Sequence, residues 1–258
     1  MTDLPHAATC AIAVMAKVPQ PGRSKTRLVP PLTSEQAAGL SAAFLRDITE
    51  NIVAASRMAS IQGFIAYAPQ GLEALFDGHI ADGTQLVLAD GNIDSPDGIH
   101  GFGRCLLHAI RSLLDRGYGS AVVLNSDSPT LPTSILARTA ASLALPGDRA
   151  VLGPAEDGGY YLLGLKTAHA YLFEDIAWST ENVALQTAQR AREVGLELII
   201  LPTWYDVDDA AALYRLIDDF ETAVSPDDPS LLPFAAPATN AFLAPMGLNL
   251  DAFIKKTA

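Results

Sequence analysis

The alternation of short apolar runs with longer segments of helical period is the feature that most limits the folds open to this 258-residue chain. Such alternation is typical of a sheet whose strands are separated by helices that cover it. Residues 9–16 read Thr-Cys-Ala-Ile-Ala-Val-Met-Ala. This run is too continuously apolar for a half-exposed strand, so we expect a central strand covered on both faces. The sequence therefore predicts an α/β fold.

The same patterns place the remaining elements along the chain. Strands are predicted at 9–16, 61–68, 84–89, 121–124, 150–153, 160–165 and 197–201. Helices are predicted at 34–56, 101–116, 132–145, 180–195 and 209–221, and Thr33 with Gln36 has the spacing of a capping box. From Val224 onward the chain is rich in both proline and apolar residues. We therefore predict one domain over residues 1–223 and a tail, 224–258, packed on the body or on a partner subunit in a homodimer.

Composition restricts the partners of this chain. With 17 basic and 29 acidic residues the formal charge is −12, which disfavours nucleic-acid binding because that affinity comes from basic side chains. No apolar run reaches the ~18 residues of a membrane span, and the N-terminal residues lack a signal-peptide pattern. Two cysteines cannot form a disulfide framework. We expect a cytoplasmic enzyme that acts on small molecules and contacts neither nucleic acid nor membrane.

A basic loop follows the predicted central strand and reverses the sign of the local charge. Residues 17–27 hold four of the 17 basic residues, namely Lys17, Arg23, Lys25 and Arg27, together with Gly22. Loops at the carboxyl ends of strands are where α/β sheets bind phosphorylated ligands, so this loop predicts a site for nucleotide phosphates. The spacing between Gly22 and Lys25 is not that of a Walker A loop. The alternative interpretation is a solvated basic loop without a ligand.

Three acidic segments follow further along the chain. Asp127 comes directly after the strand predicted at 121–124, where it could bind Mg²⁺ or Mn²⁺ with the phosphates, or only close a turn. Asp157 precedes Gly158 and Gly159, which permit either a close approach to a ligand or a tight hairpin. Asp208 lies among three acids in four positions before a helix, of which one would suffice as an N-cap. Asp208 is therefore a candidate second metal ligand.

Four motifs, in this order, resemble the nucleotide-diphospho-sugar transferase superfamily with the GT-A fold. They are MAKVPQPGRSKTRL, NSDSPTLP, GPAEDGGYYLLGL and WST, within a match from about residue 13 to 216. More closely, the chain resembles the bacterial rSAM/selenodomain-associated transferases, which are related to 2-phospholactate and molybdenum-cofactor guanylyltransferases. The resemblance implies a single three-layer αβα domain with a mixed, mostly parallel sheet. It also implies a nucleotide held by the basic loop and a divalent cation on Asp127.

From the residues and the resemblance together we expect a metal-dependent transferase that uses a nucleotide or nucleotide-sugar donor and a small-molecule acceptor. Lys17, Gly22, Arg23, Lys25, Arg27, Arg104, Gly158 and Gly159 are the candidate nucleotide-binding residues. Asp127 and Asp208 are the candidate ligands of Mg²⁺ or Mn²⁺, and Asp127 and Asp157 the candidate catalytic residues. Glycosyl transfer, nucleotidyl transfer with release of pyrophosphate, and nucleotide binding without catalysis all remain open.

Overall fold

The structure is a computed structural model that describes residues 6–222 and 228–248. Seven strands form one sheet in the order β3-β2-β1-β4-β6-β5-β7. Their bounds are β1 His6–Ala16, β2 Ile61–Tyr67, β3 Gln85–Leu88, β4 Tyr118–Leu124, β5 Arg149–Pro154, β6 Tyr160–Leu165 and β7 Glu197–Ile200. Neighbouring strands run parallel except that β6 is antiparallel to both β4 and β5. The predicted α/β fold with a mixed, mostly parallel sheet is confirmed.

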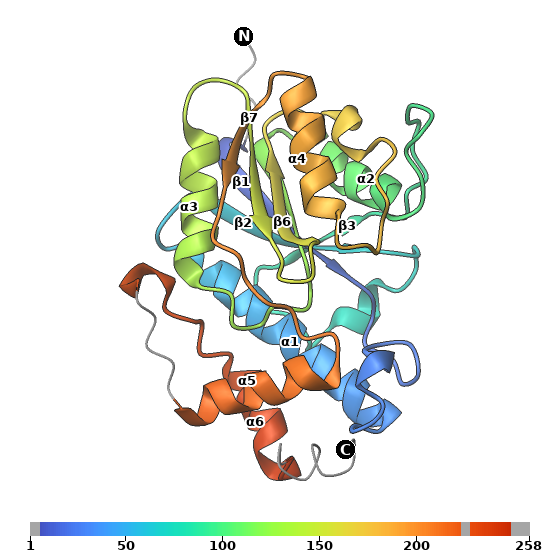
Figure 1. Cartoon of the computed structure of the whole chain (residues 1–258), viewed down its shortest axis with the longest axis vertical. Coiled ribbons are helices and arrows are strands. Elements are labelled where there is room, and N and C mark those ends of the chain that lie inside the picture. The colour runs from blue at the N-terminus through green and yellow to red at the C-terminus, as the bar shows by residue number, and fades with distance from the viewer. Residues whose placement is uncertain (1–5, 223–227, 249–258) are drawn as a thin grey trace.

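Helices cover both faces of the sheet. They are α1 Ser34–Ala55, α2 Phe102–Asp115, α3 Thr133–Ala144, α4 Val183–Glu193, α5 Ala210–Thr222 and α6 Pro237–Leu243. Short 3-10 turns are η1 Thr26–Leu28, η2 Glu73–Phe76, η3 Ala170–Phe173, η4 Pro229–Leu231 and η5 Ala244–Met246. Figure 1 shows α2 and α4 on one face and α1 and α3 on the other. Over residues 6–222 and 228–248, the structure contains no helix with the length and apolar character needed to cross a membrane.

Strand β1 is buried from both sides, as its composition predicts. Ile12 and Val14 pack in the core that includes α1 and α3, whereas Ala11 and Ala13 pack in the core that includes α2. All four side chains have an exposed fraction of 0%. Successive residues of a strand point to opposite faces, so an uninterrupted apolar run is what a strand between two helical layers requires.

Local signals set the start of α1 and explain two shifted boundaries. The predicted capping box is present, because the Gln36 N–H donates to the Thr33 hydroxyl and the Thr33 N–H donates to the Gln36 side chain. Strand β4 begins three residues before the predicted 121, since Gly119 allows the backbone to approach Ala7; a Cβ there would lie 2.0 Å from the Ala7 oxygen. Helix α4 begins at Val183, three residues after the predicted start, because residues 178–182 form turns and a bend.

The C-terminal segment that the structure describes lies against α1 and includes a helix, α6, that the sequence patterns did not predict. Both carboxylate oxygens of the fully buried Asp47 accept N–H bonds from this segment, at 2.9 Å from Ala238 and 2.7 Å from Thr239. Gly39 leaves room for the Phe242 ring, since a Cβ there would lie 2.6 Å from it. The rest of the predicted tail, 224–227 and 249–258, lies outside the described residues.

The strand order creates a crevice beside β1. The chain proceeds from β1 outward to β2 and β3 and then returns to β4 on the other side of β1. Loops that leave β1 and β4 therefore diverge at the carboxyl edge of the sheet. Such a topological switch point is where open α/β sheets bind their ligands. The basic loop leaves β1, and the turn that carries Asp127 leaves β4, at this edge.

Candidate functional site

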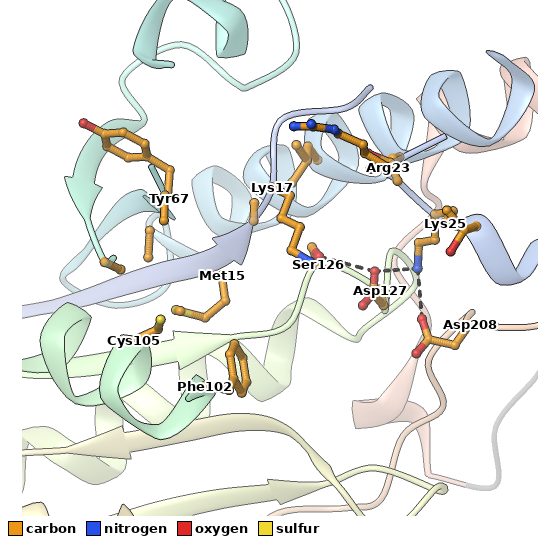
Figure 2. A pocket seen from close by; sticks show the side chains of 18 of the residues that line it. Met15, Lys17, Arg23, Lys25, Tyr67, Phe102, Cys105, Ser126, Asp127 and Asp208 are labelled. Atoms are coloured by element: carbon orange, nitrogen blue, oxygen red, sulfur yellow. Dashed lines mark hydrogen bonds and ion pairs between the residues drawn. The ribbon is translucent and has the colours of Figure 1, made fainter. Parts of the chain in front are cut away.

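A cavity of about 460 Å³ opens at the carboxyl ends of β1, β2 and β4 (Figure 2). One end is charged and is lined by Lys17, Arg23, Lys25, Arg27, Asp127 and Asp208. The other end is largely apolar and is lined by Met15, Ala66, Tyr67, Ala89, Phe102 and Cys105. A cavity with charges at one end and apolar surface at the other matches a ligand that joins an anionic group to a flat, weakly polar one.

The basic loop is folded tightly at the base of the cavity. The N–H groups of Arg23 and Ser24 donate to the Gln20 carbonyl, and the Ser24 hydroxyl accepts from the Gln20 N–H. Gly22 supplies the turn with a φ of 72°, in the left-handed region that favours glycine. Leu28, with an exposed fraction of 0%, anchors the end of the loop in the core. The loop is thereby fixed before any ligand arrives.

Lys25 is the most enclosed cation of the cavity, with only 6% of its side chain exposed. Its Nζ forms an ion pair with Asp127, donates to the Val207 carbonyl at 2.7 Å and lies 3.3 Å from Oδ1 of Asp208. An ammonium group has three N–H donors, so these contacts engage all of them. Nζ also lies 5.0 Å from the centre of the Phe44 ring. Lys25 therefore joins two of the three acidic segments of the sequence, those of Asp127 and Asp208.

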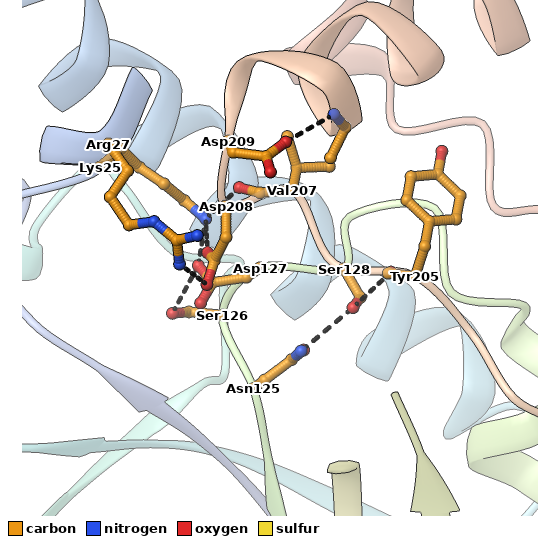
Figure 3. A network of polar contacts seen from close by, with 11 residues as sticks. Lys25, Arg27, Asn125, Ser126, Asp127, Ser128, Tyr205, Val207, Asp208 and Asp209 are labelled. Atoms are coloured by element: carbon orange, nitrogen blue, oxygen red, sulfur yellow. Dashed lines mark hydrogen bonds and ion pairs between the residues drawn. The ribbon is translucent and has the colours of Figure 1, made fainter. Parts of the chain in front are cut away.

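The turn after β4 presents the Asp127 carboxylate to the cavity because other groups hold the turn closed (Figure 3). The side-chain amide of Asn125 donates to the Ser128 hydroxyl at 3.1 Å, and that hydroxyl donates to the Tyr205 carbonyl at 2.9 Å. The Val207 N–H donates to the Asp127 carbonyl at 2.8 Å. Because these bonds do not use the Asp127 carboxylate, it forms an ion pair with Lys25 and accepts a hydrogen bond from the Ser126 hydroxyl.

The acids before α5 have separate roles. Asp209 caps the helix, since its Oδ1 accepts the Ala212 N–H at 2.9 Å, and Asp208 is therefore left to face Lys25. Burial and the Asp127 charge raise the pKa of Asp208, while Lys25 and Arg27 oppose that shift. Burial, followed by repulsion from Asp157, Asp208 and Asp127, raises the pKa of Asp206 to about 6. Asp206 is therefore close enough to these three carboxylates for their charges to repel it.

The donor set of Asp127 and Asp208 fits a divalent cation. Oδ1 of each carboxylate contacts the same nitrogen, so both oxygens already surround one point that a positive charge occupies. Hard oxygen ligands suit Mg²⁺ and Mn²⁺, which usually take one or two carboxylates and complete their shell with phosphate oxygens and water. Within residues 6–222 and 228–248, no group of three or more His, Cys, Asp or Glu side chains is arranged to hold a metal. Water, or the phosphates of a bound nucleotide, would therefore supply the remaining contacts.

Lys17, Arg23 and Arg27 are the solvent-exposed cations of the same cavity. Arg27, whose side chain is 71% exposed, lies 3.8 Å from Oδ2 of Asp208. This contact is a surface ion pair, which contributes little to the free energy of unfolding. These three side chains are exposed enough to meet phosphate oxygens, whereas Lys25 is enclosed by its bonds. The structure thus divides the four predicted phosphate-binding cations into one enclosed group and three open ones.

The other predicted site residues do not line this cavity. Arg104 donates to the Gly91 and Ile93 carbonyls and to the Ser95 hydroxyl, and so holds the loop before α2. Oδ1 of Asp157 accepts the Gly159 N–H at 2.8 Å within the hairpin. Gly158, with a φ of 87°, packs so closely that a Cβ would lie 2.1 Å from the Glu181 oxygen. Gly22 does not line the cavity either, but its φ of 72° shapes the basic loop whose side chains do.

The apolar lining of the cavity was not predicted from the sequence. Tyr67 is the last residue of β2, and Met15 is the last but one of β1. Phe102 and Cys105 are on the first turn of α2. Phe102, half exposed at the rim, packs edge to face on Trp178 with ring centres 5.7 Å apart. For Met15 and Tyr67 the one available signal was position, because a residue at the carboxyl end of a parallel strand lies at the ligand-binding edge.

Comparison with solved structures finds the same fold in transferases. A crystal structure of a "putative nucleotide-diphospho-sugar transferase" from Desulfovibrio desulfuricans G20 is 25% identical, covers 93% of this chain and 99% of its own, and has a TM-score of 0.72. The 4-diphosphocytidyl-2C-methyl-D-erythritol synthase of Anaerococcus prevotii is 9% identical, covers 83% and 99%, and has a TM-score of 0.50, which shows the fold alone. Rv0371c of Mycobacterium tuberculosis with manganese is 16% identical, covers 81% and 97%, and has a TM-score of 0.42. A likeness of that size says nothing about a metal in this chain.

None of the curated proteins compared with the sequence matches it. Residues 51–180, just over half of the chain, match the DUF2064 family, which is described as an uncharacterized protein conserved in bacteria. The matched segment contains both the Asp127 turn and the Asp157 hairpin. The chain therefore belongs to the DUF2064 family.

Proposed function

We propose that this protein is a metal-dependent transferase that binds a nucleotide-sugar or related nucleotide donor in the cavity beside β1 and moves a group from it to a small-molecule acceptor. The observation that carries the proposal is the composition of one cavity at the β1/β4 switch point. Three open cations, an enclosed lysine and two convergent carboxylates lie at its charged end. The apolar end beyond them suits a nucleobase or ribose, since aromatic and aliphatic side chains line it.

Within this proposal the chain's own residues have distinct tasks. Lys17, Arg23 and Arg27 bind the phosphates and offset their charge. Asp127 and Asp208 hold Mg²⁺ or Mn²⁺, which would neutralise charge that develops on the phosphate oxygens. Asp157 orients or deprotonates the acceptor hydroxyl, a role that its turn bond permits because that bond engages only one of its two oxygens.

Transfer of a nucleotidyl group is the second candidate. Three exposed cations in the loop after β1 could contact a third phosphate, and this is the observation that favours a triphosphate donor. The two reactions release different products. Glycosyl transfer releases a nucleoside diphosphate, whereas nucleotidyl transfer releases pyrophosphate.

Calorimetric titration with nucleoside di- and triphosphates and nucleotide-sugars of each base, with and without Mn²⁺, tests the proposal. We expect one base series to bind and the binding to require the metal. A saturating ligand at ~100 times its Kd would add about 2.7 kcal/mol to the free energy of unfolding. Failure of every nucleotide to bind in the presence of Mn²⁺ would contradict the proposal. Binding without release of either product from any acceptor would instead indicate a noncatalytic nucleotide-binding protein.

A further inference from the structure

The contacts of Lys25 raise a question that phosphate binding alone does not answer. A lysine that serves only to meet phosphates is expected to point into open cavity, as the exposed Lys17 does in the same loop. Lys25 instead turns away from solvent, and its ammonium bonds to Asp127, Asp208 and the Val207 carbonyl. Figure 3 shows these contacts converging on one nitrogen.

The ammonium and a divalent cation would compete for the same atoms. Lys25 contacts Oδ1 of Asp127 and Oδ1 of Asp208, the two atoms around the point where a cation fits. A second positive charge placed a few ångströms from a buried ammonium is repelled strongly, because little solvent screens the pair. A metal held by both carboxylates and the present position of Lys25 therefore exclude each other.

The backbone at Lys25 is held in place by its surroundings. Its φ of 50° lies in the left-handed region of backbone conformation, which residues other than glycine rarely adopt. Such a conformation persists where the surroundings determine it. The neighbouring hydrogen bonds of Ser24 and the buried Leu28 supply that constraint on either side. Only the flexible side chain of Lys25 needs to move for its ammonium to reach the cavity that it already lines.

We propose that Lys25 is a positioning residue that occupies the cation place between Asp127 and Asp208 in the metal-free protein, and that an incoming divalent cation displaces its ammonium into the cavity. The inference rests on the metal site of the proposed function. In the metal-free state Lys25 holds the two carboxylates together and offsets their repulsion. After displacement its charge joins Lys17 and Arg27 at the phosphate end.

Titration with Mn²⁺ alone, followed by electron paramagnetic resonance, tests this competition without any nucleotide. Lys25→Met keeps most of the side-chain stem and removes the charge, so Mn²⁺ should bind at least about tenfold more tightly than to the wild type. Arg27→Met removes a charge two residues away that is exposed and only 3.8 Å from Asp208, and it should change the affinity much less. Unchanged or weaker Mn²⁺ binding by Lys25→Met would overturn the proposal, as would equal tightening in both variants.

Amine labelling of the wild-type protein gives a readout that does not depend on a folded variant. Acetic anhydride should modify the exposed Lys17 with or without Mn²⁺, and should modify Lys25 poorly in the metal-free protein. Saturating Mn²⁺ should raise labelling of Lys25 relative to Lys17, as measured by mass spectrometry. Protection of Lys25 that persists at saturating Mn²⁺ would contradict displacement. Because neither experiment contains a nucleotide, a negative nucleotide screen would leave both results interpretable.

Discussion

Two turns of this molecule follow buried strands and carry an aspartate, yet they use it differently. After β4, Asn125 and Ser128 close the turn, and the Asp127 carboxylate bonds to Lys25 at the cavity. After β5, the Ala155 N–H donates to the Gly159 carbonyl, and the Asp157 carboxylate accepts the Gly159 N–H of its own hairpin. Sequence patterns alone left both aspartates open to a turn or a site interpretation.

The difference shows what makes a carboxylate available to a ligand. A turn has backbone donors that require acceptors, and an aspartate often supplies one. At residues 125–128 the turn is held without the carboxylate, because the Asn125 side chain donates to the Ser128 hydroxyl and the Val207 N–H donates to the Asp127 carbonyl. The Asp127 carboxylate can therefore point outward. Four predictions separate charged side chains that bind a ligand from those that hold the fold.

The largest effect is expected for Asp127→Asn. Asparagine retains a similar shape but loses the charge that a divalent cation needs, so metal-dependent nucleotide affinity should fall by at least about 100-fold. The free energy of unfolding should change by only about 1 kcal/mol, because the side chain is 29% exposed and its turn is closed by other groups. Calorimetry and urea unfolding measure the two quantities. Nucleotide binding at wild-type strength would mean that Asp127 is not a ligand of the metal.

Asp47→Ala should lower the stability of the fold rather than the affinity for nucleotide. The substitution leaves two N–H groups of the C-terminal segment without their acceptor, which should lower the free energy of unfolding by about 2–3 kcal/mol. Glu50→Ala, on the same helix, removes a partly exposed ion pair with Arg46 and should cost less than about 1 kcal/mol. Urea unfolding compares the two variants. Equal losses would show that Asp47 does not hold the segment.

Lys25→Met and Arg27→Met compare the enclosed and the open cation. Loss of the Lys25 contacts should lower the free energy of unfolding by about 1.5–3 kcal/mol, the usual value for hydrogen bonds to a charged group. Loss of the exposed Arg27 pair should cost about 0–1 kcal/mol. Thermal and urea unfolding at low ionic strength measure both. A larger loss for Arg27→Met would show that the Lys25 contacts contribute little to the fold.

Asp157→Asn should have the smallest effect on stability and donor binding. The asparagine carbonyl can accept the same Gly159 N–H, so the free energy of unfolding should stay within about 0.5 kcal/mol of the wild type. Donor affinity should also stay unchanged, because Asp157 does not line the cavity. If stability and donor affinity are both unchanged, a loss of turnover indicates that Asp157 acts on the acceptor. A marked loss of donor affinity would place the donor at the hairpin instead.

Much of the fold was predictable because its signals are local. The apolar run of β1 and the capping box at Thr33 each depend on residues a few positions apart, and both appear as expected. The basic loop and Asp127 were recognisable from their positions after strands. Helix α6 was not, because it has seven residues, includes a proline and depends on Asp47, nearly 200 residues away.

The arrangement of the site could be predicted only in part. Sequence patterns named Lys25, Asp127 and Asp208 but gave no reason for Lys25 to differ from Arg27. Their distinction arises from a contact across 182 residues, between Lys25 and the Val207 carbonyl, and from the burial that accompanies it. Arg104 illustrates the converse, since this basic residue, predicted to bind the nucleotide, bonds instead to the loop before its own helix. Such assignments require tertiary contacts.

A crystal structure of the protein with a nucleoside diphosphate and Mn²⁺ tests the central claim most directly. The anomalous signal of Mn²⁺ should lie between Asp127 and Asp208, with the phosphates beside Lys17, Arg23 and Arg27 and the base toward Tyr67 and Phe102. Both ligands would then occupy the cavity at the β1/β4 crevice (Figure 2). Mn²⁺ bound at the Asp157 hairpin, or a nucleotide bound outside this cavity, would contradict the account.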